Sequence, residues 1–296
     1  MAKDMTSGSP VKHIIGFAIP IFIGSIFQQF YNIVDTMIVG RFVGVNALAA
    51  VGSTASIMFC VQGIAMGMTT GFGVMISQAF GAKNDRSLRH NVAMSMYLTI
   101  LLSVIVTTIL LVINKPLLHI MNTPEEIFGG ASTYLGIIFA GFCATMAYNV
   151  FAAILRAIGD SKTPLYFLII SSGLNIILDL VFVITFQMGV AGVAYATVIS
   201  QAVSAVLCFV YMNQKYPQVM RAEAEEKVFS FRSAGTLMGM GIPMALQFSI
   251  TAFGTMIVQS TLNLLGETAI AAYAAAQKLQ GLVGQPYVAL GTAMAT

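Results

Sequence analysis

Residues 92–113 form an uninterrupted apolar segment, VAMSMYLTILLSVIVTTILLVI, that contains no Asp, Glu, Lys or Arg. A helix needs about 20 mostly apolar residues to cross the hydrocarbon core of a bilayer. The whole chain has the same character, since 57% of its 296 residues are hydrophobic and only 8% are charged. Soluble domains carry about 25% charged residues. The composition therefore predicts an integral membrane protein and excludes a cytosolic enzyme or a nucleic-acid-binding protein.

Seven further apolar stretches, on both sides of this segment, are long enough to span a membrane. All are expected to be helices, because lipid cannot satisfy the hydrogen-bonding groups of an open strand edge. The predicted fold class is therefore an all-α polytopic membrane protein. The eight predicted spans are roughly residues 14–39, 47–79, 92–113, 131–155, 165–186, 190–212, 236–264 and 269–294.

The basic residues predict the orientation. Most of the 14 Lys and Arg residues fall in the N-terminal tail or in predicted loops on the same side of the membrane. Only Arg41 and Lys115 lie in loops on the other side, and Lys278 lies inside the last predicted span. Cytoplasmic loops are enriched in Lys and Arg. We therefore expect a protein of the plasma (cytoplasmic) membrane with a cytoplasmic N-terminus.

An internal repeat relates the first and seventh predicted spans. Residues 16–20 (GFAIP) match residues 239–243 (GMGIP), and residues 44–50 (GVNALAA) match residues 266–272 (GETAIAA) at nearly the same spacing. Six spans separate the two copies. Because that number is even, the copies share one orientation and are related by an axis along the membrane normal.

The repeat predicts the domain organisation. Residues 1–213 are expected to form a six-helix N-terminal lobe, residues 214–234 a polar cytoplasmic linker, and residues 235–296 the first two helices of a second, parallel lobe. A complete second copy would extend well beyond Thr296. We therefore expect the chain to be incomplete at its C-terminus.

Two carboxylates, Asp35 and Asp179, lie inside predicted spans. An ionised Asp at the centre of a membrane helix costs about 2.5–3.5 kcal/mol, so such a residue usually faces a cavity and has a function. Polar neighbours share their helix faces at spacings of three or four residues. The sequence predicts one polar chamber, and the alternative is simple hydrogen bonding between helices. The neighbours are Gln28 and Asn32 before Asp35, Asn175 before Asp179, Thr197 with Gln201, and Asn149.

These oxygen-bearing residues suit a hard cation or a proton. Oxygens of Asp35, Asn175, Asp179 and Thr197 could hold a transient Na⁺, since hard cations prefer oxygen ligands. The same carboxylates could instead carry protons, and composition leaves Na⁺ and H⁺ open. The three Cys and three His residues have no ligand spacing, so no resident metal or cofactor is expected. The absence of a G-x-x-x-x-G-K-[ST] motif predicts that ATP is not bound through a P-loop.

Other features inside the spans allow two interpretations each. Pro20 and Pro243 interrupt their helices at matching depths, as bending points or as static kinks. Lys278 is either a charge in a cavity or a side chain that extends to the interface. A stripe of small residues in the second predicted span indicates close helix packing. These residues are Gly63, Gly67 and Gly71.

Several of these blocks together resemble the multidrug and toxic compound extrusion (MATE) transporters. The first three of the blocks named below are similar to the start of that family's sequences, and the fourth is similar to the family's loop between spans four and five. Asn175 and Asp179 are similar to its fifth-span motif. The polar residues look closest to the DinF-like branch. The blocks are residues 19–20 (IP), 35–40 (DTMIVG), 47–52 (ALAAVG) and 155–164 (LRAIGDSKTP).

The resemblance implies twelve helices in two six-helix lobes that export cationic amphiphiles in exchange for Na⁺ or H⁺. It also implies that Pro20 bends the first span. We expect a monomeric secondary antiporter that works by alternating access and is not an enzyme, since the chain lacks a nucleophile–base pair. The alternative is a lipid-linked oligosaccharide flippase of the same superfamily, for which only Lys278 offers a basic group. The implied first-lobe cation or proton site comprises Asp35, Asn149, Asn175, Asp179 and Thr197.

Overall fold

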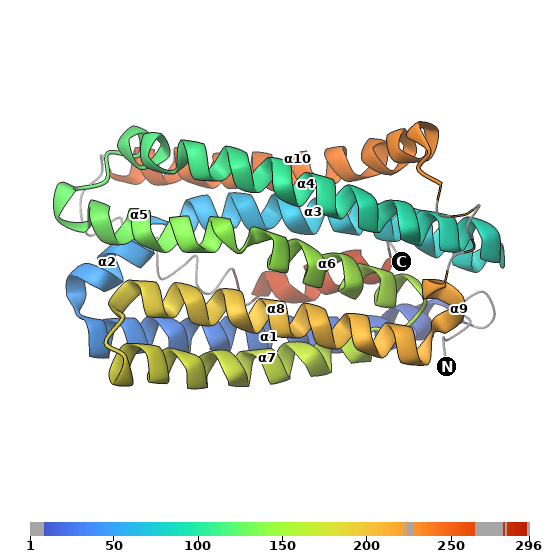
Figure 1. Ribbon diagram of the computed structural model, residues 1–296, viewed down its shortest axis with the longest axis horizontal. Coiled ribbons are helices and arrows are strands. Elements are labelled where there is room, and N and C mark those ends of the chain that lie inside the picture. Colours follow the sequence, from blue (N-terminus) through green and yellow to red (C-terminus); the bar gives the residue numbers. More distant parts are fainter. Residues whose placement is uncertain are drawn as a thin grey trace.

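The computed structural model describes residues 9–221, 223, 226, 228–263, 281 and 283–294, and every regular element in this part is helical. The elements follow one another as an up-and-down bundle (Figure 1). In chain order they are α1 (Pro10–Ile38), η1 (Val39–Val43), α2 (Val45–Ser53), α3 (Ala55–Gly81), α4 (Asp85–Ile120), α5 (Glu125–Ala140), α6 (Phe142–Ala157), α7 (Lys162–Leu180), η2 (Val181–Thr185), α8 (Gly189–Lys215), α9 (Pro217–Met220) and α10 (Phe231–Asn263).

Six helical spans in the described residues are long and apolar enough to cross a membrane, or seven if the bent pair α5–α6 forms one span. The all-α membrane fold expected from the composition is therefore confirmed. Half of the predicted eighth span lies outside the described residues, as do Lys278 and the second copy of the 44–50 motif. The predicted division into lobes, and the parallel repeat, remain predictions.

The prediction of one continuous span over residues 47–79 was wrong. The chain breaks at Thr54 into the nine-residue α2 and the long α3. The hydroxyl groups of Ser53 and Thr54 donate to the carbonyl oxygens of Ala50 (2.8 Å) and Val51 (2.7 Å). Side chains that bond back to the preceding turn compete with the helical backbone pattern. Hydropathy does not predict this break, because the residues around Thr54 are mostly apolar.

The predicted span 131–155 is also divided, since α5 and α6 meet at Gly141 with a bend of 48°. A Cβ atom at Gly141 would lie 2.3 Å from Cγ2 of Val198 in α8. Only glycine therefore lets α8 approach the bend so closely. The bend turns α6 along α8, against which both α5 and α6 pack.

The bundle has two sides (Figure 1). Helices α1, α7 and α8 pack together on one side, α3, α4 and α10 on the other, and α5 and α6 lie between them. Buried side chains form one cluster toward the end of the bundle where the chain begins, around Phe72 and Met212, and another toward the opposite end, around Phe139 and Leu118. Residues 283–294 return to the start of α1, where Ala289 packs with Phe17.

The glycine stripe on α3 packs directly on α10, which confirms the close helix packing expected from the small residues. An added Cβ atom would lie 2.5 Å from Cα of Ala245 at Gly67 and 2.5 Å from Cα of Gly241 at Gly71. At Gly63 it would lie 2.8 Å from Cβ of Phe248. The backbones of α3 and α10 thus approach closely around the middle of both helices.

Two π-helical turns end the helices that carry the aspartates. η1 follows Asp35 by one turn, η2 begins two residues after Asp179, and the two turns contact each other. The backbone then reverses through glycines with positive φ, at Gly44 (φ 117°) and Gly189 (φ 57°). Glycine tolerates this conformation because it has no Cβ. π-Turns within helices occur frequently at functional sites.

Candidate functional site

A cavity of about 410 Å³ opens between α1, α2, α3, α5, α6 and α8. It lies in the half of the bundle remote from the start of the chain, since it uses the last third of α1 and the first turns of α3. Its wall is mixed, with apolar side chains from α3 and α5 facing polar side chains from α1 and α8. The lining residues from α1 and α8 are Gln28, Tyr31, Asn32, Asp35, Thr36, Thr197, Val198 and Gln201.

The polar face predicted for the first span is the face that lines this cavity. Gln28, Asn32 and Asp35 lie three to four residues apart in an uninterrupted α-helix and all reach the cavity wall. Thr197 and Gln201, one turn apart on α8, lie on the same wall. The structure therefore brings together five of the residues that the sequence had proposed for a polar chamber.

Asn175 and Asp179 lie behind this wall rather than on it. Their exposed fractions are 1% and 0%, and neither lines the cavity. Their helix α7 packs between α1 and α8. The carboxyl groups of Asp35 and Asp179 are close enough to influence each other electrostatically. The site thus has two layers: Asp35 faces the cavity, and Asp179 lies buried behind it.

Several polar atoms in the two layers have no hydrogen-bond partner among the described residues. A buried polar group without a partner costs free energy, so such groups are rare in folded proteins. Here they gather around the two carboxylates, and most are acceptor oxygens, which fit a proton or a small hard cation. The atoms are Oδ1 of Asp35, both side-chain oxygens of Asp179, Oδ1 and Nδ2 of Asn175, and Oε1 of Gln201.

Two tyrosines that the sequence analysis did not select belong to the site. The Tyr31 hydroxyl lies 3.2 Å from Oγ1 of Thr197, which itself donates to the carbonyl oxygen of Val193 (3.1 Å). Because a threonine hydroxyl has a single hydrogen, Tyr31 donates to Thr197. Tyr134 of α5 is buried and interacts electrostatically with both aspartates. Tyr31 lies one turn before Asp35 and could have been found by that spacing, whereas no sequence signal marks Tyr134.

Asn149 and the two prolines have less evident roles. Asn149 donates to the carbonyl oxygen of Thr145 in its own helix (2.8 Å), and it does not line the cavity, although Thr145 does. The helices continue through Pro20 and Pro243 without interruption. The functional roles proposed for these three residues remain predictions.

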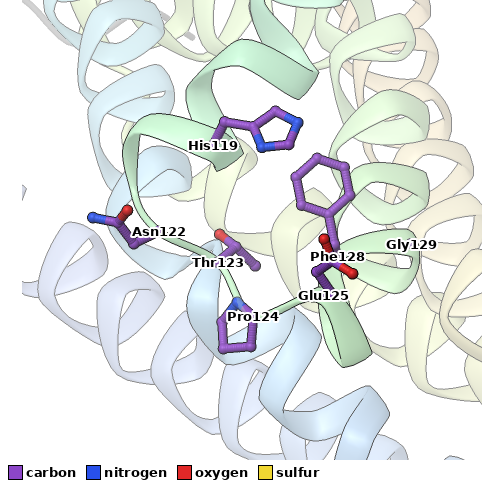
Figure 2. Close-up of a pocket in the computed structure, with 7 residues that line it drawn as sticks. All are labelled: His119, Asn122, Thr123, Pro124, Glu125, Phe128 and Gly129. Carbon is purple, nitrogen blue, oxygen red and sulfur yellow. The ribbon is translucent and has the colours of Figure 1, made fainter.

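A second hollow, of about 560 Å³, lies at the turn between α4 and α5. Figure 2 shows the ring of His119 beside the ring of Phe128, with the Glu125 carboxylate nearby. The ring centroids are 4.6 Å apart. The described residues contain no group of three or more His, Cys, Asp or Glu side chains that could hold a metal ion. The Asp35 cavity is the stronger candidate site, because buried polar atoms without a hydrogen-bond partner lie at and behind its wall.

These features define a class, a polytopic helical membrane protein with an internal polar site between its spans. The family model described as MatE matches residues 20–181. The chain therefore belongs to the MATE family, whose members are transporters and not enzymes.

Known proteins resemble nearly the whole chain. It is 29% identical to the probable multidrug resistance protein YpnP of Bacillus subtilis, covering 99% of this chain and 65% of YpnP. It is 31% identical to the probable multidrug resistance protein YoeA of the same organism, covering 94% of this chain and 61% of YoeA. The chain thus spans less than two thirds of the length of these relatives.

Solved structures confirm the fold. A structure described as the outward-facing conformation of a multidrug resistance MATE family transporter of the MOP superfamily superposes with a TM-score of 0.90. The two sequences are 27% identical, and the match covers 97% of this chain and 63% of the other.

Proposed function

We propose that the intact protein is a secondary antiporter that exports cationic, amphiphilic small molecules through the Asp35 cavity. The observation that carries this proposal is the charge of the lining. Among the described residues of the wall, Asp35 is the one ionisable carboxylate and none is a Lys or Arg. A negative group in a partly dry cavity favours a cationic guest. A flippase for lipid-linked pyrophosphates would need a basic lining, whereas the described part of the wall carries an acidic group, Asp35.

The apolar part of the wall suits a variable aromatic substrate. Aromatic faces attract organic cations through their ring quadrupole, and Met side chains repack easily around different shapes. The cavity offers both next to a single carboxylate. The aromatic and Met residues of the lining are Tyr31, Met58, Phe59, Tyr134 and Phe142.

The buried pair supplies the coupling to an ion gradient. Two carboxylates in a low-dielectric site repel each other, so a proton or a cation is needed to neutralise one of them. Na⁺ and H⁺ would then compete for the oxygens of Asp35, Asn175, Asp179 and Thr197. Binding of either ion would neutralise the charge that holds a cationic drug at Asp35 and would release the drug.

The geometry supports an outward-facing conformation in the plasma membrane. The basic loops predict a cytoplasmic N-terminus, and the cavity lies in the half of the bundle away from that end. At the cytoplasmic half, α3 and α10 pack together through buried side chains that include Ala79 and Leu237. Alternating access would separate these helices and close the cavity on the other side.

Drug fluorescence tests the coupling in the purified intact protein. Bound ethidium is titrated against pH at zero and at saturating Na⁺, and we expect Na⁺ to release ethidium and to move the midpoint to lower pH. Asp35→Asn should weaken ethidium binding, whereas Glu125→Gln, which removes an equal charge in the hollow at the α4–α5 turn, should not. Superimposable curves with and without Na⁺ would mean that protons alone drive release. Equal binding by Asp35→Asn and the wild type would refute the assignment of the cavity.

A further inference from the structure

The polar linker between α8 and α10 lies against the bundle at the end where the chain begins. It includes α9, which packs on α4. Tyr216 and Val219 are buried in the cluster of apolar side chains at this end. The Tyr216 hydroxyl donates to Oδ2 of Asp160 at the start of α7 (3.1 Å). The linker is therefore anchored to the first six spans before it reaches α10.

An ion pair joins the linker to the first turns of α4. The guanidinium of Arg89 donates from Nε to Oε2 of Glu226 (2.7 Å) and from Nη2 to Oε1 (2.6 Å). The backbone N–H of Glu223 also donates to Oε2 (2.8 Å). Arg89 lowers the pKa of Glu226 to about 2 through these hydrogen bonds, so the carboxylate is ionised at neutral pH. Paired, two-pronged contacts of this kind are among the stronger hydrogen bonds in proteins.

The neighbouring His90 extends this contact to α10. Its Nδ1 lies 2.9 Å from the carbonyl oxygen of Glu226, and its Nε2 lies 2.8 Å from Oγ of Ser233. A carbonyl oxygen can only accept, so Nδ1 carries the hydrogen, and Nε2 of the neutral ring accepts from the Ser233 hydroxyl. Ser233 lies in the first turn of α10. One imidazole thus connects α4, the linker and α10.

We propose that Arg89, His90, Glu226 and Ser233 form a clasp that holds the cytoplasmic end of the bundle closed while the Asp35 cavity is open on the other side. This inference rests on the alternating-access part of the proposed function. α4 belongs to the predicted first lobe and α10 to the second, so rocking of the lobes stretches the contacts between them. At the same end as the clasp, Leu237 of α10 lies in one cluster of buried side chains with Ala79 of α3 and Leu88 of α4. Opening that end requires the contact of His90 with Ser233 to break, and it pulls on Glu226, which precedes α10 by five residues.

A distance measurement between the lobes tests the clasp without any transport step. Spin labels are placed on Lys162→Cys at the start of α7 and on Phe231→Cys at the start of α10, in intact protein without other cysteines. Both positions are exposed, Phe231 by 87%. Pulsed electron resonance then gives the ratio of short to long separations. Glu226→Gln removes the charge and keeps the size. We expect it to raise the long fraction about tenfold, which corresponds to about 1.4 kcal/mol, close to the lower end of the range for one hydrogen bond to a charged group.

Three further variants make the result decisive. Glu223→Gln removes an equal charge three residues away and should leave the distances unchanged. His90→Ala should also raise the long fraction, because it removes the link to Ser233. The exchange Arg89→Glu with Glu226→Arg rebuilds the pair and should restore the short distance, which keeps the test valid if a single variant unfolds.

The outcomes separate a clasp from a static anchor. A static anchor would lower the melting temperature in Glu226→Gln and leave the distances as in the wild type, and that result would overturn the proposal. Unchanged distances together with unchanged melting temperatures would overturn it as well. Because no ion or drug is added, a failure of the ethidium titration leaves this measurement unaffected, and the two proposals can fail separately.

Discussion

Replacement of Gly67 by Ala tests the packing of α3 on α10. Gly67 lies in the middle of the glycine stripe, and an added Cβ would lie 2.5 Å from both Cα and N of Ala245. These are backbone atoms of the neighbouring helix, so no side-chain rotation relieves the contact. The two helices would have to separate by about 1 Å to reach an ordinary carbon–carbon distance of about 3.5–4.0 Å.

The expected effect is the balance of two opposing contributions. Overpacking a well-packed interface costs about 1–3 kcal/mol, and Ala is better than Gly inside a helix by about 1 kcal/mol. Gly67→Ala should therefore lose up to about 2 kcal/mol of stability. Gly239 in α10 is the matched control, because a Cβ there has no neighbouring atom within 4 Å. Gly239→Ala should gain up to about 1 kcal/mol.

Helicity at 222 nm during heating of the detergent-purified intact protein measures both variants. We expect the midpoint of Gly67→Ala to fall below the wild type and that of Gly239→Ala to match or exceed it. The sign of the difference is the test, since each change adds one methyl group to a helical glycine. Equal midpoints for the two variants would refute the close approach of α3 and α10.

Three further predictions follow from the site and the linker. Asp179→Asn should abolish gradient-driven ethidium efflux in everted vesicles without lowering the melting temperature; pumping at the wild-type rate would make Asp179 structural. Tyr31→Phe and Thr197→Val should each lower the free energy of unfolding by about 0.6 kcal/mol, the average for hydrogen bonds between membrane helices. If the two side chains share one hydrogen bond, the double variant should lose no more stability than the more affected single variant. The pKa of Glu226 falls from an ordinary 4.5 to about 2, so its stabilisation is complete above about pH 4.5 and is lost as pH falls toward 2. The difference in melting temperature between wild type and Glu226→Gln should therefore be constant from pH 8 to 5 and shrink below that range, and a constant difference down to pH 2 would contradict the ion pair.

The spans could be predicted because hydropathy alone decides them. The segment 92–113 lies within α4, and α4 extends beyond it at both ends, to Asp85 and Ile120. The polar first turn of α4 is stabilised by an N-cap, since the Asn84 side chain accepts a hydrogen bond from the backbone N–H of Ser87 (3.0 Å). Hydropathy does not register such caps. It also does not register breaks such as Thr54 and Gly141, which depend on hydroxyl groups and on a neighbouring helix.

The site could be predicted only as far as one helix determines it. The face formed by Gln28, Asn32 and Asp35 follows from the helical period of 3.6 residues. The depth of Asp179 does not, because it depends on how α7 packs between α1 and α8. Tyr134 reaches the aspartates from α5, and nothing in its own segment distinguishes it from other aromatic residues of the spans. Contacts between helices therefore account for Tyr134 and for the depth of Asp179, whereas Tyr31 could have been found from its spacing to Asp35.

The two-layer arrangement gives Asp35 a particular place in the proposed cycle. Asp35 lines the cavity and also interacts with Asp179, so it is the group that both a drug and a coupling ion would contact. Asp179 has no surface on the cavity, so it cannot contact a drug there and can act on it only electrostatically or by way of Asp35. A positive charge bound at either carboxylate reduces the attraction of the other for a second positive charge. A drug and an ion therefore need not occupy the same position to compete. An ion bound to the buried oxygens behind Asp35 could displace a cationic drug from the cavity.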